Sequence, residues 1–359
     1  MSRATAVRLP LPIKIQRSIL KGSAKIPAPV RGVMSRLTAV NSDGDRLDPS
    51  LALVATASAY IPSLALVGES VTGSRAAIEV NSAMMAQTFE HFAVEEDLLI
   101  ETDSGAVPAT RYSVEGRGRG LIVFYHGGGF VLGSRASHDS AVRALAVASG
   151  ADVLSVDYRL APEHVFPAAV DDSLAAWRFA VRKAPDWGID PRRIAVAGDS
   201  AGGNLSAVVA QQVRGEDVVP CLQLLIYPVV DMSRKRGSMQ EFSKGYFLTE
   251  AQIDYFCDTY LESRDQLSDP RVSPLLADDL SGLAPAHVVV AGFDPLRDEG
   301  LEYADALEKA GVPVTVERAG SMIHGFINMA LLSPEAHAVV ERMGRAVADA
   351  MDGVLISAG

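Results

Sequence analysis

Short apolar segments alternate with longer amphipathic ones from residue 97 onward, and this alternation restricts the possible folds more than any other feature. Apolar runs typical of buried strands occupy 121–126, 153–158, 194–198, 222–230, 287–291 and 312–317. Helical patterns occupy 140–148, 168–183, 201–213, 298–310 and 335–351. Strands that alternate with helices form βαβ units, so we expect an α/β fold with a mostly parallel central sheet flanked by helices.

The first two strands of this region, and the two segments that lie outside the alternation, refine the predicted fold. Two strand-like segments, 98–101 and 110–114, have no helix between them, which favours an antiparallel start to the sheet. The alternation is absent from 1–92 and from 231–283. Ligands bind beyond the carboxyl ends of the strands in an open α/β sheet, so we expect these two segments to form a helical cap (lid). The α/β core then comprises 93–230 and 284–359.

The net charge argues against a nucleic-acid partner, and the first 42 residues differ in charge from the rest of the chain. The formal net charge is −11 over 359 residues, so a broad phosphate-neutralising face for nucleic acid is not expected. Residues 1–42 nevertheless carry eight Lys or Arg and no Asp or Glu. Basic residues interrupt every apolar stretch there, which argues against a secretory signal peptide. An exposed arm is the favoured interpretation, while a transit peptide or a surface-binding amphipathic helix stays open.

Two further features bear on the membrane and the compartment. Segment 49–68 is uncharged, but a proline and several hydroxyl-bearing residues dilute its apolarity. Helices packed on the protein are therefore favoured over a membrane span. Cys221 and Cys257 are the only cysteines, too few for a disulfide framework or a structural zinc site. We expect a soluble, cytoplasmic protein without stable membrane insertion.

The pentapeptide Gly198-Asp199-Ser200-Ala201-Gly202 is the only GxSxG in the chain, and it joins a predicted strand to a predicted helix. A nucleophile elbow requires this context, because a tight turn lifts the serine above the sheet and small flanking residues relieve crowding. The turn also places Ser200 at a helix N-terminus, which favours developing negative charge. Taken alone, the pentapeptide fits an ordinary glycine-rich turn equally well.

A second glycine-rich segment, His126-Gly127-Gly128-Gly129-Phe130, follows an earlier apolar strand. Three glycines let the backbone approach a ligand closely and direct N–H groups toward it. Acyl transfer uses such donors for the oxyanion, each worth about 10²–10³-fold in rate. A flexible or anion-binding loop is the alternative. A phosphate-binding P-loop is disfavoured, because no Lys-Ser or Lys-Thr follows at the required spacing.

A serine nucleophile needs a general base, and the base needs a carboxylate that orients it. In an α/β hydrolase the acid and then the histidine follow the serine along the chain. Three histidines follow Ser200. His287 begins a predicted strand and His337 lies inside the terminal helix, whereas His324 lies in a loop between a strand and a helix. His324 is therefore the favoured base.

Several acidic residues lie between this serine and this histidine. Asp294 directly follows a predicted strand, at the ligand-binding edge of the sheet, and is the favoured acid. Asp298 and Glu299 more plausibly open the next helix, where acidic side chains complement the helix dipole. Asp278 and Asp279 lie in the irregular segment before it.

Together these motifs resemble the hormone-sensitive lipase family of α/β-hydrolase carboxylesterases, including its bacterial members. The matching motifs are HGGG at 126–129, DYRLAPE at 157–163, GDSAGGN at 198–204, DPLRDE at 294–299 and HGF at 324–326. Their order and spacing make a chance match implausible. The resemblance implies the α/β-hydrolase fold. No motif of the family could be matched in 1–92 or 231–283.

The resemblance also implies a role for each site residue. Ser200 would be the nucleophile, His324 the general base and then acid, and Asp294 the residue that orients His324. His126 would hold the glycine loop in place. Such an enzyme hydrolyses an ester through an acyl-enzyme and requires neither metal nor organic cofactor. The N–H groups expected to form the oxyanion hole belong to Gly128, Gly129 and Ala201.

The cap of this family usually admits short- to medium-chain acyl groups, so the resemblance implies a carboxylesterase acting on a small ester rather than a true lipase. The aromatic residues expected to line its substrate pocket are Phe130, Tyr246 and Phe247, with Tyr255 and Phe256 nearby in the sequence. An equally good interpretation of the aromatic residues at 246–256 is that they hold the cap to the core. Many family members also form homodimers.

Two other functions stay open at this point. The same three residues could hydrolyse an amide, a thioester or a carbamate, because protonation of the leaving group by His324 differs little among these substrates. A non-catalytic ligand-binding protein on the same fold is the other alternative. It is disfavoured, since relatives of that kind typically lose the histidine.

Overall fold

The predicted alternation of strands and helices builds an eight-stranded sheet in the computed structural model, which describes residues 28–61, 64–89, 91–115 and 118–354. The strands lie in the order β1-β2-β4-β3-β5-β6-β7-β8. Their bounds are Val94–Thr102 (β1), Gly105–Ser113 (β2), Leu121–Tyr125 (β3), Asp152–Val156 (β4), Ile194–Asp199 (β5), Gln223–Ile226 (β6), Ala286–Phe293 (β7) and Val314–Ile323 (β8).

The sheet is parallel except at its first edge. β1 pairs with β2 and β2 pairs with β4 in antiparallel register, whereas β4, β3, β5, β6, β7 and β8 pair in parallel. Both predictions, a mostly parallel sheet and an antiparallel start, are confirmed. The main helices are Arg135–Ser149 (α5), Ala168–Lys183 (α6), Ala201–Gln212 (α7), Arg297–Lys309 (α10) and Pro334–Met351 (α11).

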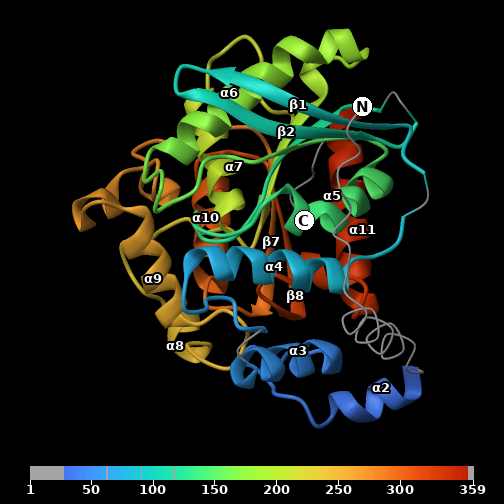
Figure 1. Cartoon of the computed structure of the whole chain (residues 1–359), viewed down its shortest axis with the longest axis vertical. Helices are drawn as coiled ribbons and strands as arrows, with labels where there is room; N and C mark the ends of the chain where they lie inside the picture. The colour runs from blue at the N-terminus through green and yellow to red at the C-terminus, as the bar shows by residue number, and fades with distance from the viewer. Residues whose placement is uncertain (1–27, 62–63, 90, 116–117, 355–359) are drawn as a thin grey trace.

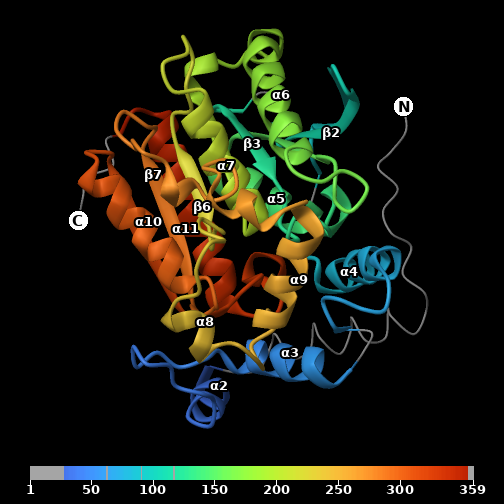
Figure 2. The same cartoon turned by 90° about the vertical axis from the view of Figure 1, so that its left-hand side faces the viewer.

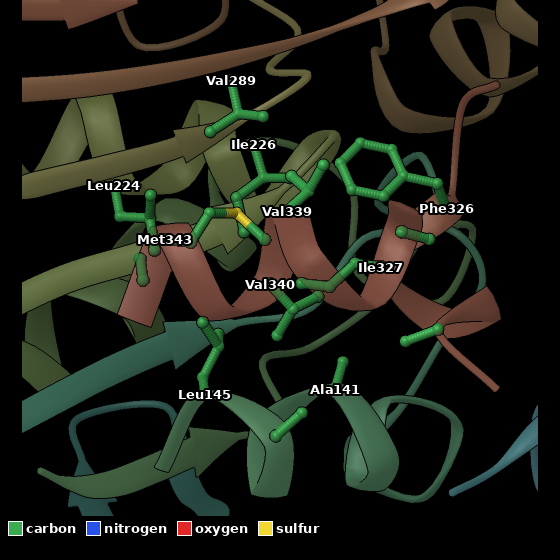
Figure 3. Close-up of a cluster of buried hydrophobic side chains, with 14 of the residues drawn as sticks. Ala141, Leu145, Leu224, Ile226, Val289, Phe326, Ile327, Val339, Val340 and Met343 are labelled. Carbon is green, nitrogen blue, oxygen red and sulfur yellow. The ribbon is translucent and has the colours of Figure 1, made fainter. Parts of the chain in front are cut away.

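Helices cover both faces of the sheet and give it two hydrophobic layers. α5 and α11 pack together on one face, and α6, α7 and α10 cover the other (Figures 1 and 2). In Figure 3, α11 lies between the strands and α5, with Val339 and Met343 toward Leu224 and Ile226 and with Val340 toward α5. All of these side chains are buried, which explains the apolar runs in the central strands.

At the carboxyl edge of the sheet, the predicted ends of two strands are wrong by four residues or more. The strand predicted at 222–230 ends at Ile226, because Tyr227 takes a φ of 35° and the chain turns toward the elbow. There the Val229 N–H donates to the carbonyl oxygen of Ser200. Conversely, β8 extends to Ile323, so most of the predicted loop before His324 is strand.

The two segments outside the alternation contain five α-helices within the described residues. They are Ala28–Ser35 (α2), Pro49–Tyr60 (α3), Val71–Met85 (α4), Gly237–Glu241 (α8) and Glu250–Tyr260 (α9). α2, α3 and α8 lie together at the lower end of the molecule in both views, with α4 and α9 above them (Figures 1 and 2). The predicted basic arm lies mostly in residues 1–27, outside the described residues. None of the helices in the described ranges has the length and hydropathy needed to span a bilayer.

Candidate active site

The turn after β5 holds Ser200 in a backbone conformation that residues with side chains seldom adopt. Its φ is 56° and its ψ is −117°, and such positions cost about 1–3 kcal/mol and cluster at functional sites. The flanking glycines are required by close contacts. A Cβ on Gly198 would lie 2.3 Å from the Gly202 carbonyl oxygen, and one on Gly202 would lie 1.9 Å from that of Tyr125. The pentapeptide thus forms a sharp strand-to-helix turn with Ser200 at its apex.

Ser200, His324 and Asp294 form one hydrogen-bonded chain. His324 Nε2 lies 3.0 Å from Ser200 Oγ, and His324 Nδ1 lies 2.8 Å from Asp294 Oδ2. Ser200 is 7% exposed, His324 6% and Asp294 0%. A carboxylate that accepts a hydrogen bond from Nδ1–H leaves Nε2 free to accept the serine proton. The geometry therefore suits activation of the serine hydroxyl.

The parallel topology explains why residues so distant in the sequence meet. β5, β7 and β8 end at the same edge of the sheet, and each is followed at once by one of the three residues. Asp294 is fixed further by its second oxygen, Oδ1, which accepts the Leu296 N–H at 2.9 Å. The site is therefore assembled by strand ends, which place side chains more rigidly than long loops do.

The glycine loop after β3 lies beside Ser200. Gly128 and Gly129 take φ values of 122° and 62°, and a Cβ on Gly128 would lie 2.2 Å from the Leu132 carbonyl oxygen. In the described part of the chain, the N–H groups of Gly128, Gly129 and Ala201 donate to no protein acceptor. Unpaired N–H groups at a buried site are available to a ligand oxygen, as an oxyanion hole requires.

A cavity of about 300 Å³ connects these groups. Ser200, His324, Gly128 and Gly129 lie on its wall, and α3, α4 and α9 contribute much of the remainder. The lining is predominantly apolar, and Asp199 is its only acidic or basic member apart from histidine among the described residues. Representative apolar lining residues are Leu53, Leu66, Ile78, Met85, Met232, Ile253, Phe256 and Leu332.

The aromatic residues predicted to bind substrate are placed differently from one another. Phe130 and Phe247 belong to the cavity lining. Tyr246 does not, and the structure corrects this prediction. Its ring packs against Phe242 at 5.2 Å and Phe293 at 5.6 Å between ring centroids, because the chain reverses at Phe247, whose φ is 76°. Adjacent aromatic residues therefore point in different directions.

The comparison with known proteins agrees with this geometry. Residues 122–328, more than half of the sequence, match the family described as the α/β hydrolase fold. The chain belongs to the α/β-hydrolase family. A carboxylic ester hydrolase of Mycobacterium tuberculosis, LipN, is 45% identical over 314 residues, which cover 85% of this chain and 83% of LipN. An ethyl acetate hydrolase of Pseudomonas putida is 39% identical and covers 73% of this chain and 85% of its own.

A solved α/β-hydrolase structure shows the same similarity in three dimensions. The hyperthermophilic esterase of the archaeon Pyrobaculum calidifontis superposes with a TM-score of 0.78 at 38% identity, covering 84% of this chain and 98% of the esterase. These matches confirm the predicted fold and the resemblance to the hormone-sensitive lipase family of carboxylesterases.

His287 and His337, the two histidines that were not favoured as the general base, lie outside the active site. His287 Nδ1 is 2.6 Å from Thr315 Oγ1, between β7 and β8. His337 lies on α11, where Nδ1 is 3.0 Å from Gln87 Nε2. Neither belongs to the cavity lining. Only His324 of these three is placed to reach Ser200.

The sequence analysis missed a segment that holds the strand-end loops in place. The Asn41 side chain donates to the carbonyl oxygen of Gly292 at 3.0 Å, two residues before Asp294. The Asp48 N–H donates to the carbonyl oxygen of Ser321 at 2.9 Å, shortly before His324. Residues 39–48 had no periodicity or motif that could have suggested these contacts, which depend only on where the segment crosses the sheet edge.

Glu299 also has a role that the sequence did not suggest. It lies in the first turn of α10, as predicted. Its Oε1 accepts the Val230 N–H at 2.8 Å, and its Oε2 lies 3.9 Å from Arg236 Nη1. Burial raises the pKa of this carboxyl to about 8, although the Val230 N–H and Arg236 lower it. Glu299 is therefore a buried support for the loop after β6, rather than a simple partner of the helix dipole.

This buried carboxyl predicts a pH dependence of stability. The folded state holds the Glu299 proton up to about pH 8, whereas an unfolded glutamate releases it near 4.5. Stability is therefore lost as the pH rises through this window. Glu299→Gln keeps the acceptor oxygen and removes the ionisation, so its Tm relative to wild type should increase from pH 5 to pH 8. Glu308→Gln, at an exposed position of the same helix, is the control. A Tm difference between Glu299→Gln and wild type that is the same at both pH values would contradict the prediction.

Proposed function

We propose that this α/β hydrolase is a serine carboxylesterase that cleaves short- to medium-chain acyl esters. The observation that carries the proposal is the hydrogen-bonded chain from Ser200 through His324 to Asp294, which opens on an apolar cavity. The names of its relatives support the same reaction class, since LipN is a carboxylic ester hydrolase and the Pseudomonas relative an ethyl acetate hydrolase.

The proposed reaction has two halves. Ser200 Oγ attacks the ester carbonyl carbon while His324 Nε2 takes its proton, and the alcohol then leaves with that proton. Water repeats the sequence on the acyl-enzyme and releases the acid. Asp294 orients His324 throughout and stabilises its positive charge. The N–H groups of Gly128, Gly129 and Ala201 receive the oxyanion in both halves, each worth about 10²–10³-fold in rate.

We further propose that 1–92 and 231–283 form the cap and that 93–230 with 284–359 form the core. The lining of the cavity by α3, α4 and α9 supports this division. Arg75 on α4 supports it as well, because it donates to Glu163 at 2.8 Å and to the carbonyl oxygen of Val131 at 2.8 Å, and so ties the cap to the loop after the glycines.

The composition of the cavity supports an uncharged substrate of limited length. No Lys or Arg among the described residues lines it, so a carboxylate or phosphate would be desolvated without a partner. An apolar acyl chain is stabilised instead, by about 0.8 kcal/mol for each CH₂ that becomes buried. Because the cavity has a limited volume, further CH₂ groups add no stabilisation once it is filled.

A series of p-nitrophenyl esters from acetate to palmitate tests the proposal. We expect kcat/KM to rise about fourfold per added CH₂ at first, to reach its maximum between butyrate and octanoate, and to fall steeply at palmitate. Phe247→Leu should shift the preferred length, since Phe247 lines the cavity. Tyr246→Leu is the matched control and should keep the wild-type profile. A maximum at palmitate would contradict the proposed cavity limit.

The substrate preference of the wild-type protein distinguishes ester hydrolysis from hydrolysis of an amide, a thioester or a carbamate. A panel of matched p-nitrophenyl ester, anilide, thioester and carbamate substrates should give the highest kcat/KM for the ester. Faster hydrolysis of the anilide than of the ester would reassign the reaction while leaving the three residues in place.

We also propose a cellular location and an assembly for this protein. Cys221 and Cys257 are both free thiols, in keeping with a reducing cytoplasm. We propose a homodimer, the assembly that the resemblance implies, and light scattering of the purified full chain measures it directly.

A further inference from the structure

The proposed oxyanion hole is formed by the glycine loop and by the elbow at Ser200. The Asp199 carboxylate, which belongs to the elbow, connects these two segments. Asp199 immediately precedes Ser200 and is 3% exposed. Its Oδ1 accepts the Gly127 N–H at 2.8 Å, and its Oδ2 accepts the Tyr227 hydroxyl at 3.3 Å. A Cβ on Gly127 would lie 2.4 Å from Oδ2, so only glycine allows the loop to approach the carboxylate this closely. One side chain of the elbow therefore fixes the glycine loop.

His138, on α5, contacts the same carboxylate oxygen as the Gly127 N–H. Its Nε2 lies 3.2 Å from Asp199 Oδ1, and the ring is 3% exposed. Burial by itself would raise the pKa of Asp199, but the charge and hydrogen bond of His138, together with the Gly127 N–H, lower it below its ordinary value. Asp199 is therefore a buried carboxylate that remains ionised because donors surround it.

The carbonyl side of Gly127 is fixed as well. His126 Nδ1 lies 2.8 Å from the Gly127 carbonyl oxygen, and the ring stacks on Tyr158 at 4.4 Å between centroids. Burial lowers the pKa of His126 to about 4, so this imidazole is neutral at pH 7 and can donate from Nδ1. Gly127 is thus held at both its N–H and its C=O, directly before the two glycines that face Ser200.

We propose that His138 is a positioning residue for the oxyanion hole, acting through Asp199 on the Gly127 N–H. This inference rests on the proposed function. Preorganised donors lower the barrier only while they stay aimed at the developing oxyanion. A displacement of about 1 Å costs on the order of 10²-fold in rate. If His138 no longer holds Asp199, the carboxylate can rotate away from Gly127 and the loop loses its anchor.

Two variants of His138 separate hydrogen bonding from packing. His138→Gln keeps an N–H that can donate to Asp199, whereas His138→Phe fills the site without a donor. The readout is the ratio of kcat/KM for an ester to that for its thionoester, in which sulfur replaces the carbonyl oxygen. Sulfur is a poor hydrogen-bond acceptor, so this ratio reports on the oxyanion hole, whereas a general loss of folded enzyme lowers both rates equally.

We expect His138→Phe to lower kcat for the ester about 10- to 100-fold with little change in KM, and to lower the ester-to-thionoester ratio about tenfold. His138→Gln should keep a ratio within about threefold of wild type. His287→Phe, at a buried histidine outside the cavity, should leave the ratio unchanged.

An ester-to-thionoester ratio in His138→Phe equal to that of wild type, or equal ratios in the Phe and Gln variants, would overturn this inference and leave the proposed function intact. If wild type hydrolyses no ester at all, the proposed function fails and this inference fails with it. Should His138→Phe not fold, His138→Leu takes its place under the same criterion.

Discussion

Replacing Ser200 with alanine is expected to reduce kcat for p-nitrophenyl butyrate by at least about 10⁴-fold, down to the rate supported by binding and the oxyanion hole alone. The reason is that Ser200 Oγ is the only hydroxyl within hydrogen-bond distance of His324 Nε2 among the described residues. The fold should persist, because the Ser200 side chain makes no other hydrogen bond in the described structure and alanine leaves the backbone of the elbow unchanged.

Ser206→Ala is the matched control for this experiment. Ser206 is a buried serine of α7, the helix that follows Ser200, but its Oγ donates to the carbonyl oxygen of Gly202 at 2.8 Å and does not line the cavity. We expect this variant to keep kcat within a few-fold of wild type. Equal activity in Ser200→Ala and Ser206→Ala would eliminate Ser200 as the nucleophile.

Replacing His324 with alanine is expected to have the second largest effect, again at least about 10⁴-fold in kcat. Without the imidazole, the Ser200 hydroxyl has no base and Asp294 is left as a buried carboxylate without its partner. His287→Ala and His337→Ala should keep activity close to that of wild type, because neither residue lines the cavity.

The two controls also separate catalysis from stability. His287 is buried between two strands, so its alanine variant can lower Tm while kcat at 25 °C stays near wild type. His324→Ala should show the opposite pattern, with a folded protein and no turnover. Comparable kcat losses in all three histidine variants would contradict the assignment of the base.

The sequence predicted the strands and the three hydrogen-bonded residues well because local signals were strong there. The strands β5 and β7 are mostly apolar runs, and Ser200 and Asp294 directly follow them. β8 contains several polar residues, and His324 was recognised instead from its place between a strand and a helix. Parallel strands necessarily bring their carboxyl ends to one edge. The proximity of these residues therefore followed from strand order, without knowledge of any side-chain contact.

Side-chain direction could not be predicted in the same way. Tyr246 and Phe247 are adjacent and chemically similar, yet only Phe247 reaches the cavity, because its φ of 76° turns the chain. His138 lies in an ordinary helical pattern, and its contact with Asp199 spans two elements. Contacts of this kind depend on tertiary packing, for which the sequence carries no periodic signal.

The segments proposed as the cap were predicted from interruptions of the α/β pattern, without the course of the chain inside them. Segment 49–68 was expected to pack on the protein as helices, and α3 confirms a helix there. Its contribution to the cavity wall, through residues such as Leu53 and Leu66, was not foreseen. Short helices without a regular apolar stripe take their positions from the surface that they cover, which is known only once the core is built.

Covalent labelling tests the central proposal, that Ser200 is the nucleophile of a carboxylesterase, most directly. In wild type, Ser200 Oγ should attack the phosphorus of diethyl p-nitrophenyl phosphate, release one p-nitrophenolate per chain and retain the diethyl phosphoryl group. Peptide mass mapping should then locate this group on Ser200, with parallel loss of esterase activity and no adduct in Ser200→Ala. Esterase activity that survives full labelling, or an adduct on a different residue accompanying the loss of activity, would contradict the account.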